Sequence, residues 1–300
     1  MNGGLLLSII SFDENFLKKL DRLALATKMV VKGETGGNRK SSHKGSSVEF
    51  SDFREYVHGD DFRRIDWNAY ARFERFFIKL FMEEQESLVT IFIDCSKSMD
   101  WGQPHKGTLA KQLSAVFAYL ALANYDRVAL VALSERPEFQ LAPFSGKQGF
   151  WKALEFIDNI PYDGKTRLNA AIRNYSNLGG RGGISIILTD LFSSDGYEEA
   201  LKYLQYKKQE ITLVHILSPQ ELEPKWSGSF RLIDSEGGEP KEITITPQIL
   251  RSYKKVLKSF LQEVQGFCYQ RGINYIPVSS ALSLEQVVFD KLVRLGVIGR

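Results

Sequence analysis

Oxygen-bearing side chains follow two apolar runs of this sequence, and their types suit a hard divalent cation. One run leads directly into an Asp-x-Ser-x-Ser arrangement made by Asp94, Ser96 and Ser98. A second run leads into Asp190, and Thr166 lies in the loop before an intervening helical segment. Carboxylate and hydroxyl oxygens are ligands for Mg²⁺, Mn²⁺ or Ca²⁺ rather than for Zn²⁺. The sequence therefore predicts one cation site with the ligands Asp94, Ser96, Ser98, Thr166 and Asp190.

The segments around these positions predict a fold that would bring them together. From Leu88 onward, short β-branched runs alternate with amphipathic segments of helical length. This alternation is typical of an α/β fold with a doubly wound, mostly parallel sheet and helices on both faces. In such Rossmann-type sheets, ligands bind beyond the carboxyl ends of strands where the strand order reverses. The alternative is that the serines and Asp190 only cap helices.

The expected elements can be given by residue number. Strands are expected at 88–94, 127–133, 184–190, 211–217 and 274–278. Helices are expected at 108–125, 149–159, 168–178, 197–207, 247–271 and 283–295. A short antiparallel piece at 139–144 and a hairpin at 230–246 complete the sheet region.

The first 86 residues are expected to form a separate N-terminal part, and residues 87–300 the cation-binding domain. Apolar residues at helical spacing predict an amphipathic helix over 12–31. An exposed basic loop is expected over 33–47, because Gly, Ser, Lys and Arg dominate it. The stretch 50–81 is dense in aromatic residues interleaved with Arg and Asp, which indicates an ordered segment rather than a loop.

Within that aromatic and arginine-rich segment, the sequence predicts a short helix and a strand. Asp60 or Asp61 would cap a helix that ends at Arg72, and a strand over 76–82 would join the edge of the following sheet. We expect Trp67 to be packed beneath an ion-pair network that locks the segment onto the sheet. The charged residues of that network are Arg54, Arg63, Arg64, Arg72, Asp60, Asp61 and Asp66. Direct binding of a ligand by these side chains is the alternative.

The five predicted cation ligands resemble the metal-ion-dependent adhesion site of von Willebrand factor A domains. The resemblance covers roughly residues 88–278 and implies a von Willebrand factor A-like fold. It also implies that Ser96, Ser98 and Thr166 bind the ion directly, and that Asp94 and Asp190 often bind it through water. The acidic side chain of a partner would complete the coordination shell.

Residues 45–84 resemble a bacterial family labelled domain of unknown function 58. The matching residues are Gly45, Glu49, Phe50, Phe53, Arg54, Glu55, Tyr56, Gly59, Asp60, Asp61, Arg63, Arg64, Ile65, Asp66, Trp67, Ala71, Arg72, Glu83 and Glu84. The resemblance implies a von Willebrand factor A-like domain after this segment and an association with MoxR-type AAA ATPases. Many relatives carry two membrane helices before the segment, whereas the chain resembles the shorter members without them.

Composition and apolar runs argue for an ordinary globular protein of the cytoplasm. Hydrophobic residues make up 43% of the chain and charged residues 25%, and the net charge is only +3. This charge is too mild to indicate a nucleic-acid binder. The two cysteines are too few for a disulfide framework, which suggests a reducing compartment. No apolar run reaches the length that spans a bilayer, so no membrane span is expected.

Three functions are weighed. The first is a non-enzymatic adaptor that engages an Asp or Glu of a protein partner through the cation. The family resemblance implies that this partner is a MoxR-type AAA ATPase or its client, in the assembly or maturation of that client. The second is a metal-dependent hydrolase, for which His58 and His105 are the candidate bases. The third is a weak nucleic-acid binder through a basic stretch, made by Lys28, Lys32, Arg39, Lys40 and Lys44. We favour the adaptor, because no P-loop occurs and an open coordination position suits an acidic partner.

Overall fold

The computed structural model describes residues 12–34, 48–83, 87–133, 139–165, 167–178, 182–232 and 241–296. The chain divides into two compact units. One unit combines Met1–Glu34 with Ser87–Arg300, and the other comprises Thr35–Glu86. We call them the α/β unit and the arm, and each is described by itself.

The α/β unit is built on a six-stranded sheet with the order β10-β7-β6-β3-β4-β5. All neighbouring strands are parallel except β5, which pairs with β4 in the antiparallel sense. The strands are β3 (Leu88–Asp94), β4 (Arg127–Leu133), β5 (Gln140–Phe144), β6 (Gly183–Thr189), β7 (Gln209–Leu217) and β10 (Asn274–Ser279). The protein therefore has the expected α/β fold with a mostly parallel central sheet.

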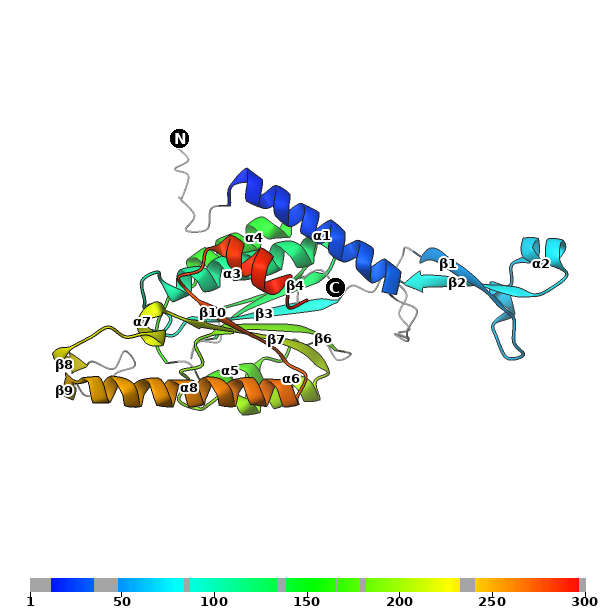
Figure 1. Ribbon diagram of the computed structural model, residues 1–300. Coiled ribbons are helices and arrows are strands. Elements are labelled where there is room, and N and C mark those ends of the chain that lie inside the picture. Colours follow the sequence, from blue (N-terminus) through cyan, green and yellow to red (C-terminus); the bar gives the residue numbers. More distant parts are fainter. Residues whose placement is uncertain are drawn as a thin grey trace, which may run out of the picture. The chain divides into compact units, whose positions relative to one another are not determined.

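Helices cover both faces of this sheet, as Figure 1 shows for α3 and α4 on one face and α5, α6 and α8 on the other. Two separate apolar cores result, and each lies between the sheet and one helical layer. The helices are α1 (Glu14–Glu34), α3 (Lys106–Ala123), α4 (Gly149–Asn159), α5 (Leu168–Asn174), α6 (Glu198–Tyr206), α7 (Pro219–Leu222) and α8 (Pro247–Gln270). Double coverage explains why β3 is an almost continuous apolar run: both of its faces are buried.

The strand order places a reversal beside β3. From β3 the chain proceeds outward to β4 and β5, and it then returns to β6 on the opposite side of β3. The carboxyl ends of β3 and β6 consequently lie next to each other, because the two strands are parallel and paired in register from Val89 with Ile184 to Ile93 with Leu188. This is the position at which ligands bind in open α/β sheets.

The last helical segment differs from expectation in its geometry. The expected helix over 283–295 contains a π-helix, η2, at Gln286–Leu292. Helix α1 packs on the α/β unit, as an amphipathic helix is expected to do, although the expected boundary at residue 86 grouped it with the segment after it. Phe16 and Leu20 of α1 are buried in one of its two cores, and Tyr119 of α3 donates a hydrogen bond to Asp21. None of the described helices is both long and apolar enough to cross a membrane.

A small hairpin joins α7 to α8. Its strands are β8 (Gly228–Leu232) and β9 (Lys241–Ile245), which pair with each other in the antiparallel sense. This hairpin was expected from the sequence at 230–246. Thr246 then caps the long helix α8, because its side chain accepts a hydrogen bond from the backbone of Ile249.

The arm is a two-stranded antiparallel ribbon with short helices at its turn. Its elements are β1 (Val48–Glu55), η1 (Phe62–Arg64), α2 (Trp67–Phe73) and β2 (Phe77–Glu83). Two aspartates act as caps: Asp61 accepts a hydrogen bond from the backbone of Arg63, and Asp66 accepts from those of Asn68 and Ala69.

The arm corrects three expectations. Strand β2 pairs with β1 and forms no part of the six-stranded sheet. The single helix expected from Asp60 or Asp61 to Arg72 is interrupted at Ile65, which bridges to Ile78 of β2 instead of continuing the helix. Trp67, expected to be packed, is 63% exposed, and no residue of α2 is buried. Of the expected ion pairs, the one between Arg54 and Asp60 is present, and Nη2 of Arg54 lies 2.9 Å from Oδ1 of Asp60.

Candidate cation site at the carboxyl edge of the sheet

The Asp-x-Ser-x-Ser segment forms a tight turn where β3 ends. Asp94 and Ser96 are each 1% exposed, and the backbone N–H of Ser96 donates to Asp94 Oδ1 at 3.0 Å. The hydroxyl oxygens of Ser96 and Ser98 lie 2.9 Å apart. One carboxylate and two hydroxyls are thereby gathered within a single turn, which brings together three of the five predicted ligands.

The end of β6 meets this turn directly. Thr189 donates from its hydroxyl to Asp94 Oδ2 at 2.6 Å, and its own hydroxyl oxygen accepts from the backbone of Leu191 at 3.0 Å. The expectation that the residues after β6 neighbour those after β3 is therefore confirmed. Thr189 was not among the predicted ligands. Its position directly before Asp190, at the end of an expected strand, could have indicated that it lies at the site.

Asp190 is held by a buried lysine that sequence reasoning missed. Lys106 Nζ lies 2.8 Å from Asp190 Oδ2 and 2.5 Å from Glu221 Oε1, and the lysine side chain is fully buried. The other oxygen, Asp190 Oδ1, accepts from the backbone of Phe192 at 3.0 Å. Two carboxylates around one ammonium ion form a compact charged cluster, in which loss of the lysine would leave two neighbouring carboxylates without a compensating charge.

The loop that carries Thr166 also lies beside the turn. Thr166 itself lies outside the described residues, but its neighbours make two backbone hydrogen bonds to the segment after β3. Asp163 donates to the carbonyl oxygen of Cys95 at 3.0 Å, and Lys97 donates to that of Gly164 at 3.3 Å. The loop before α5 therefore approaches the Asp-x-Ser-x-Ser turn from a second side.

His215 of β7 forms a hydrogen bond with the backbone of Asp190. Its Nε2 lies 3.0 Å from the carbonyl oxygen of Asp190, and its Nδ1 lies 2.8 Å from the hydroxyl of Tyr275. A carbonyl oxygen can only accept, so Nε2 carries the hydrogen and Nδ1 accepts from the tyrosine. Burial of the ring disfavours its charged form and lowers the pKa of His215 to about 4. The histidine is consequently neutral at physiological pH and acts as a structural link.

The donor atoms of this site fit a hard divalent cation. Asp94, Ser96 and Ser98 offer oxygens only, and such oxygens are the ligands that Mg²⁺ and Ca²⁺ prefer in proteins. Asp190 shares its Oδ2 with the ammonium group of Lys106. Its coordination of a cation would therefore be weaker than that of Asp94. Cys95 is 2% exposed, and its thiol lies 3.2 Å from the carbonyl oxygen of Leu133, as expected for a small packed residue.

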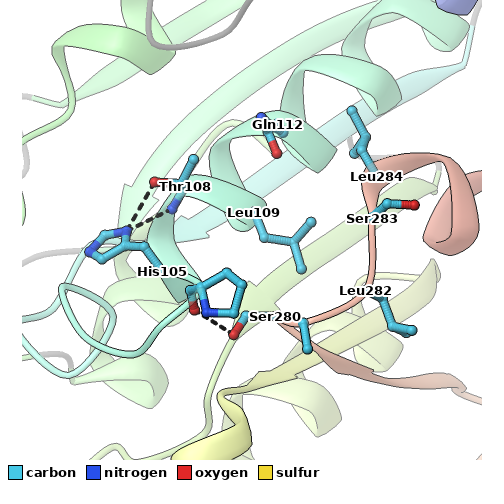
Figure 2. Close-up of a pocket in the computed structure, with 10 residues that line it drawn as sticks. His105, Thr108, Leu109, Gln112, Ser280, Leu282, Ser283 and Leu284 are labelled. Atoms are coloured by element: carbon cyan, nitrogen blue, oxygen red, sulfur yellow. Dashed lines mark hydrogen bonds between the residues drawn. The ribbon is translucent and has the colours of Figure 1, made fainter.

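A pocket of about 330 Å³ lies beside the start of α3 (Figure 2). Its lining combines the first turn of α3 with the segment 280–284 after β10. His105, one of the two candidate bases, borders the pocket but caps the helix: its Nδ1 accepts from the backbone of Thr108 at 3.0 Å. The Nε2 atom of the same ring lies 3.0 Å from Asp100 Oδ1. Both ring nitrogens thus have partners within the protein. The other candidate base, His58, is an exposed residue of the arm.

Comparison with protein families and curated relatives gives one family and several bacterial relatives. Residues 52–259 match the family model described as "Protein of unknown function DUF58". The curated relatives include "Uncharacterized protein Rv1480" of Mycobacterium tuberculosis and "Uncharacterized protein Mb1516" of Mycobacterium bovis. Each is 23% identical over 257 residues, a region that covers 84% of this chain and 81% of the relative.

Two solved structures are among those similar to this chain. One is an aerotolerance-related membrane protein from Bacteroides fragilis, with 19% identity and a TM-score of 0.41; the match covers 69% of this chain and 99% of that one. The other is a conserved hypothetical protein, BatB, from Bacteroides thetaiotaomicron. Here the identity is 16% and the TM-score 0.37, with 70% and 99% of the two chains covered.

Proposed function

The chain belongs to the DUF58 family of bacterial proteins, and we propose that it is a non-enzymatic adaptor that binds a protein partner through a divalent cation. In this proposal the α/β unit is von Willebrand factor A-like. The cation is Mg²⁺, with Mn²⁺ and Ca²⁺ as substitutes. The ligands are those expected from the sequence: Asp94, Ser96, Ser98, Thr166 and Asp190.

The observation that carries the proposal is the turn after β3. Asp94, Ser96 and Ser98 direct a carboxylate and two hydroxyls into one small volume at the reversal of strand order. Thr189 and the backbone of Ser96 hold the Asp94 carboxylate from two sides, so its orientation is fixed before any ligand arrives. A fixed set of hard oxygens lowers the entropic cost of binding an ion.

The chemistry also favours an acidic partner. A bound cation would supply a positive centre with an open coordination position, which a carboxylate of another protein can fill. Lys97 and Lys165 are exposed beside the turn, and their charges attract an acidic surface. By the family resemblance, the partner is a MoxR-type AAA ATPase or its client in the cytoplasm. This chain would link the ATPase to the client.

The hydrolase alternative has less support. A general base must reach the proton that it abstracts. His105 uses Nδ1 to cap α3, and its Nε2 lies at Asp100, so neither nitrogen is directed at the turn after β3. We therefore place any ATP hydrolysis in the partner rather than in this chain.

Cation binding can be tested by titration calorimetry of the full chain with Mg²⁺ and Mn²⁺. We expect one site in the wild type and a loss of affinity of at least roughly tenfold in Asp94→Asn and in Ser98→Ala, since the first removes the negative charge of a ligand and the second removes a hydroxyl ligand. Glu199→Gln on the exposed face of α6 is the matched control and should bind as the wild type does. An unchanged affinity in Asp94→Asn, with the circular dichroism spectrum intact, would remove the site.

Partner binding needs a separate experiment in the native cell. Affinity capture should lose the same protein partners when EDTA is added and when Asp94→Asn is the bait. Added salt should weaken capture less, because a desolvated contact with a cation is screened less than exposed charge pairs are. Metal-dependent hydrolysis of nucleotides, phosphoesters or peptides by the purified chain, abolished by Asp94→Asn, would contradict the adaptor proposal.

A further inference from the structure

Four exposed aromatic side chains lie in a row that begins at the candidate cation site, with the ammonium group of Lys106 near the first two. We call Phe192, Trp101, Trp226 and Phe230 the aromatic row. The ring centroids of Trp101 and Trp226 are 6.2 Å apart, and those of Trp226 and Phe230 are 6.4 Å apart. Between 38% and 40% of each of the four residues is exposed.

Lys106 fixes the position of the row relative to the site. Its ammonium nitrogen, which lies 2.8 Å from Asp190, also lies 5.5 Å from the ring centroid of Phe192 and 6.0 Å from that of Trp101. Such cation–π geometry holds both rings beside the carboxylate. In the sequence, moreover, Trp101 comes three residues after Ser98, and Phe192 two residues after Asp190.

The aromatic row is not required to fill the interior of the α/β unit. None of its four members belongs to the two apolar cores of the described residues. A group of neighbouring exposed aromatic side chains is a feature of binding sites, where Trp in particular contributes much of the binding energy. The row therefore has the properties of a recognition surface.

The charges around the row specify what it would bind. At the end of the row near the cation site, exposed basic side chains outnumber acidic ones: Lys97, Lys165 and Arg167 against Asp100 and Asp163. At the hairpin end, Lys225 and Arg231 are balanced by Glu223 and Glu242. A partner with acidic and apolar side chains would match this pattern. A second copy of this chain matches it less well, because its own surface at this edge has the same basic excess.

We propose that the aromatic row is the second half of the partner site and determines its specificity, an inference that rests on the function proposed above. The occupant is an extended segment of a partner protein with one Asp or Glu and a large apolar side chain close to it. The acidic residue occupies the cation site, and the apolar side chain packs against Trp101 and Trp226. At ~3.3 Å per residue of extended chain, the two centroid separations of the row correspond to about four residues.

The test uses the full chain, immobilised in Mg²⁺, and a phage library of random twelve-residue peptides eluted with EDTA. Elution by chelation selects only peptides whose binding depends on the cation. We expect the recovered sequences to contain an acidic residue with a Trp, Phe, Leu or Ile within about four positions of it. Individual peptides should bind Trp226→Ala and Trp101→Ala at least roughly tenfold more weakly than the wild type.

Trp151→Ala is the matched control, because this tryptophan of α4 is 73% exposed and is not part of the row. It should bind the selected peptides as the wild type does, and all three variants should keep the wild-type Mg²⁺ affinity. Recovery of acidic peptides without neighbouring apolar residues, or equal binding by Trp226→Ala, would overturn the role of the row. Absence of EDTA-eluted peptides from a chain that binds Mg²⁺ would overturn it as well. A wild-type chain that binds no Mg²⁺ would instead refute the cation site itself.

Discussion

The charged cluster at the carboxyl edge of the sheet and the aromatic segment of the arm show opposite relations between polarity and exposure. Asp94, Asp190 and Lys106 are charged, yet each is at most 1% exposed. Phe62 and Trp67 are large aromatic residues, yet 66% and 63% of them are exposed. Residue type therefore does not decide burial in this protein; the number of structural layers around a residue does.

The physical cause is the size of the two units. In the α/β unit a six-stranded sheet with helices on both faces can surround even an ammonium group, provided that carboxylates accompany it. In the arm, two strands and a helix of seven residues provide no second layer. Among the side chains described in the arm, only Asp66 and Ile78 are buried. A two-stranded ribbon is marginal by itself for this reason.

The sharpest test of this contrast is Lys106→Met. The variant would leave the buried Asp190 and the partly buried Glu221 as neighbouring carboxylates without an ammonium group, and we expect the free energy of unfolding to fall by about 3 to 5 kcal/mol. Urea denaturation measures the change. Lys202→Met, which removes an exposed pair on α6, should leave the urea midpoint unchanged. Equal losses in the two variants would show that the buried cluster is not more important than a surface pair.

A smaller effect is expected from pH through His215. The unfolded histidine takes up a proton below pH 6.5, whereas burial keeps the native one neutral down to about pH 4. Stability is therefore unaffected above pH 6.5 and is lost as the pH falls through this window, by about 2 kcal/mol at pH 5. The measurement is urea denaturation at pH 7.5 and pH 5 for the wild type and for His215→Gln. The variant lacks this titration, so it should lose less stability on acidification; the same loss in both proteins would exclude His215 as the cause.

The smallest effect is expected in the arm. Trp67→Ala should change the free energy of unfolding by less than about 1 kcal/mol, because most of this side chain is already in water. Phe92→Ala is the comparison from the sheet, where a fully buried ring packs 5.6 Å from that of Tyr175, and should cost about 3 to 5 kcal/mol. Thermal denaturation followed by circular dichroism would compare the two. A large loss in Trp67→Ala would mean that the arm is covered in solution.

The sheet was largely predictable from the sequence because its signal is repetitive. The expected strands 88–94 and 127–133 agree with β3 and β4 at both ends, and the helix 149–159 agrees with α4. Each of these elements has a complete pattern of buried positions, which few other structures would satisfy. The same pattern predicted a doubly wound strand order, and this order predicted that Asp94 lies next to the end of β6.

Lys106 was not predictable by the same rules, and the reason is local. The helix was expected to begin at Thr108, but it begins at Lys106 because the ring of His105 caps it. Rules for helix starts rely on Ser, Thr, Asp and Asn, so a histidine cap escapes them. The ion cluster with Asp190 and Glu221 depends on side chains 84 and 115 positions away, which no local pattern reports. In the arm, the density of aromatic residues predicted a packed segment. Such packing requires further layers of secondary structure, which the described part of the arm does not have.

The strand order also has a consequence for synthesis of the chain on the ribosome. Strand β10 pairs with β7 at the end of the sheet, although β8, β9 and α8 lie between them in the sequence. Until β10 emerges, one edge of β7 carries unpaired backbone groups on a strand whose residues from Ile211 to Leu217 are all apolar or buried. A nascent chain that ends before β10 therefore exposes an edge that can pair with other chains. We expect such intermediates to depend on chaperones until the final strand closes the sheet.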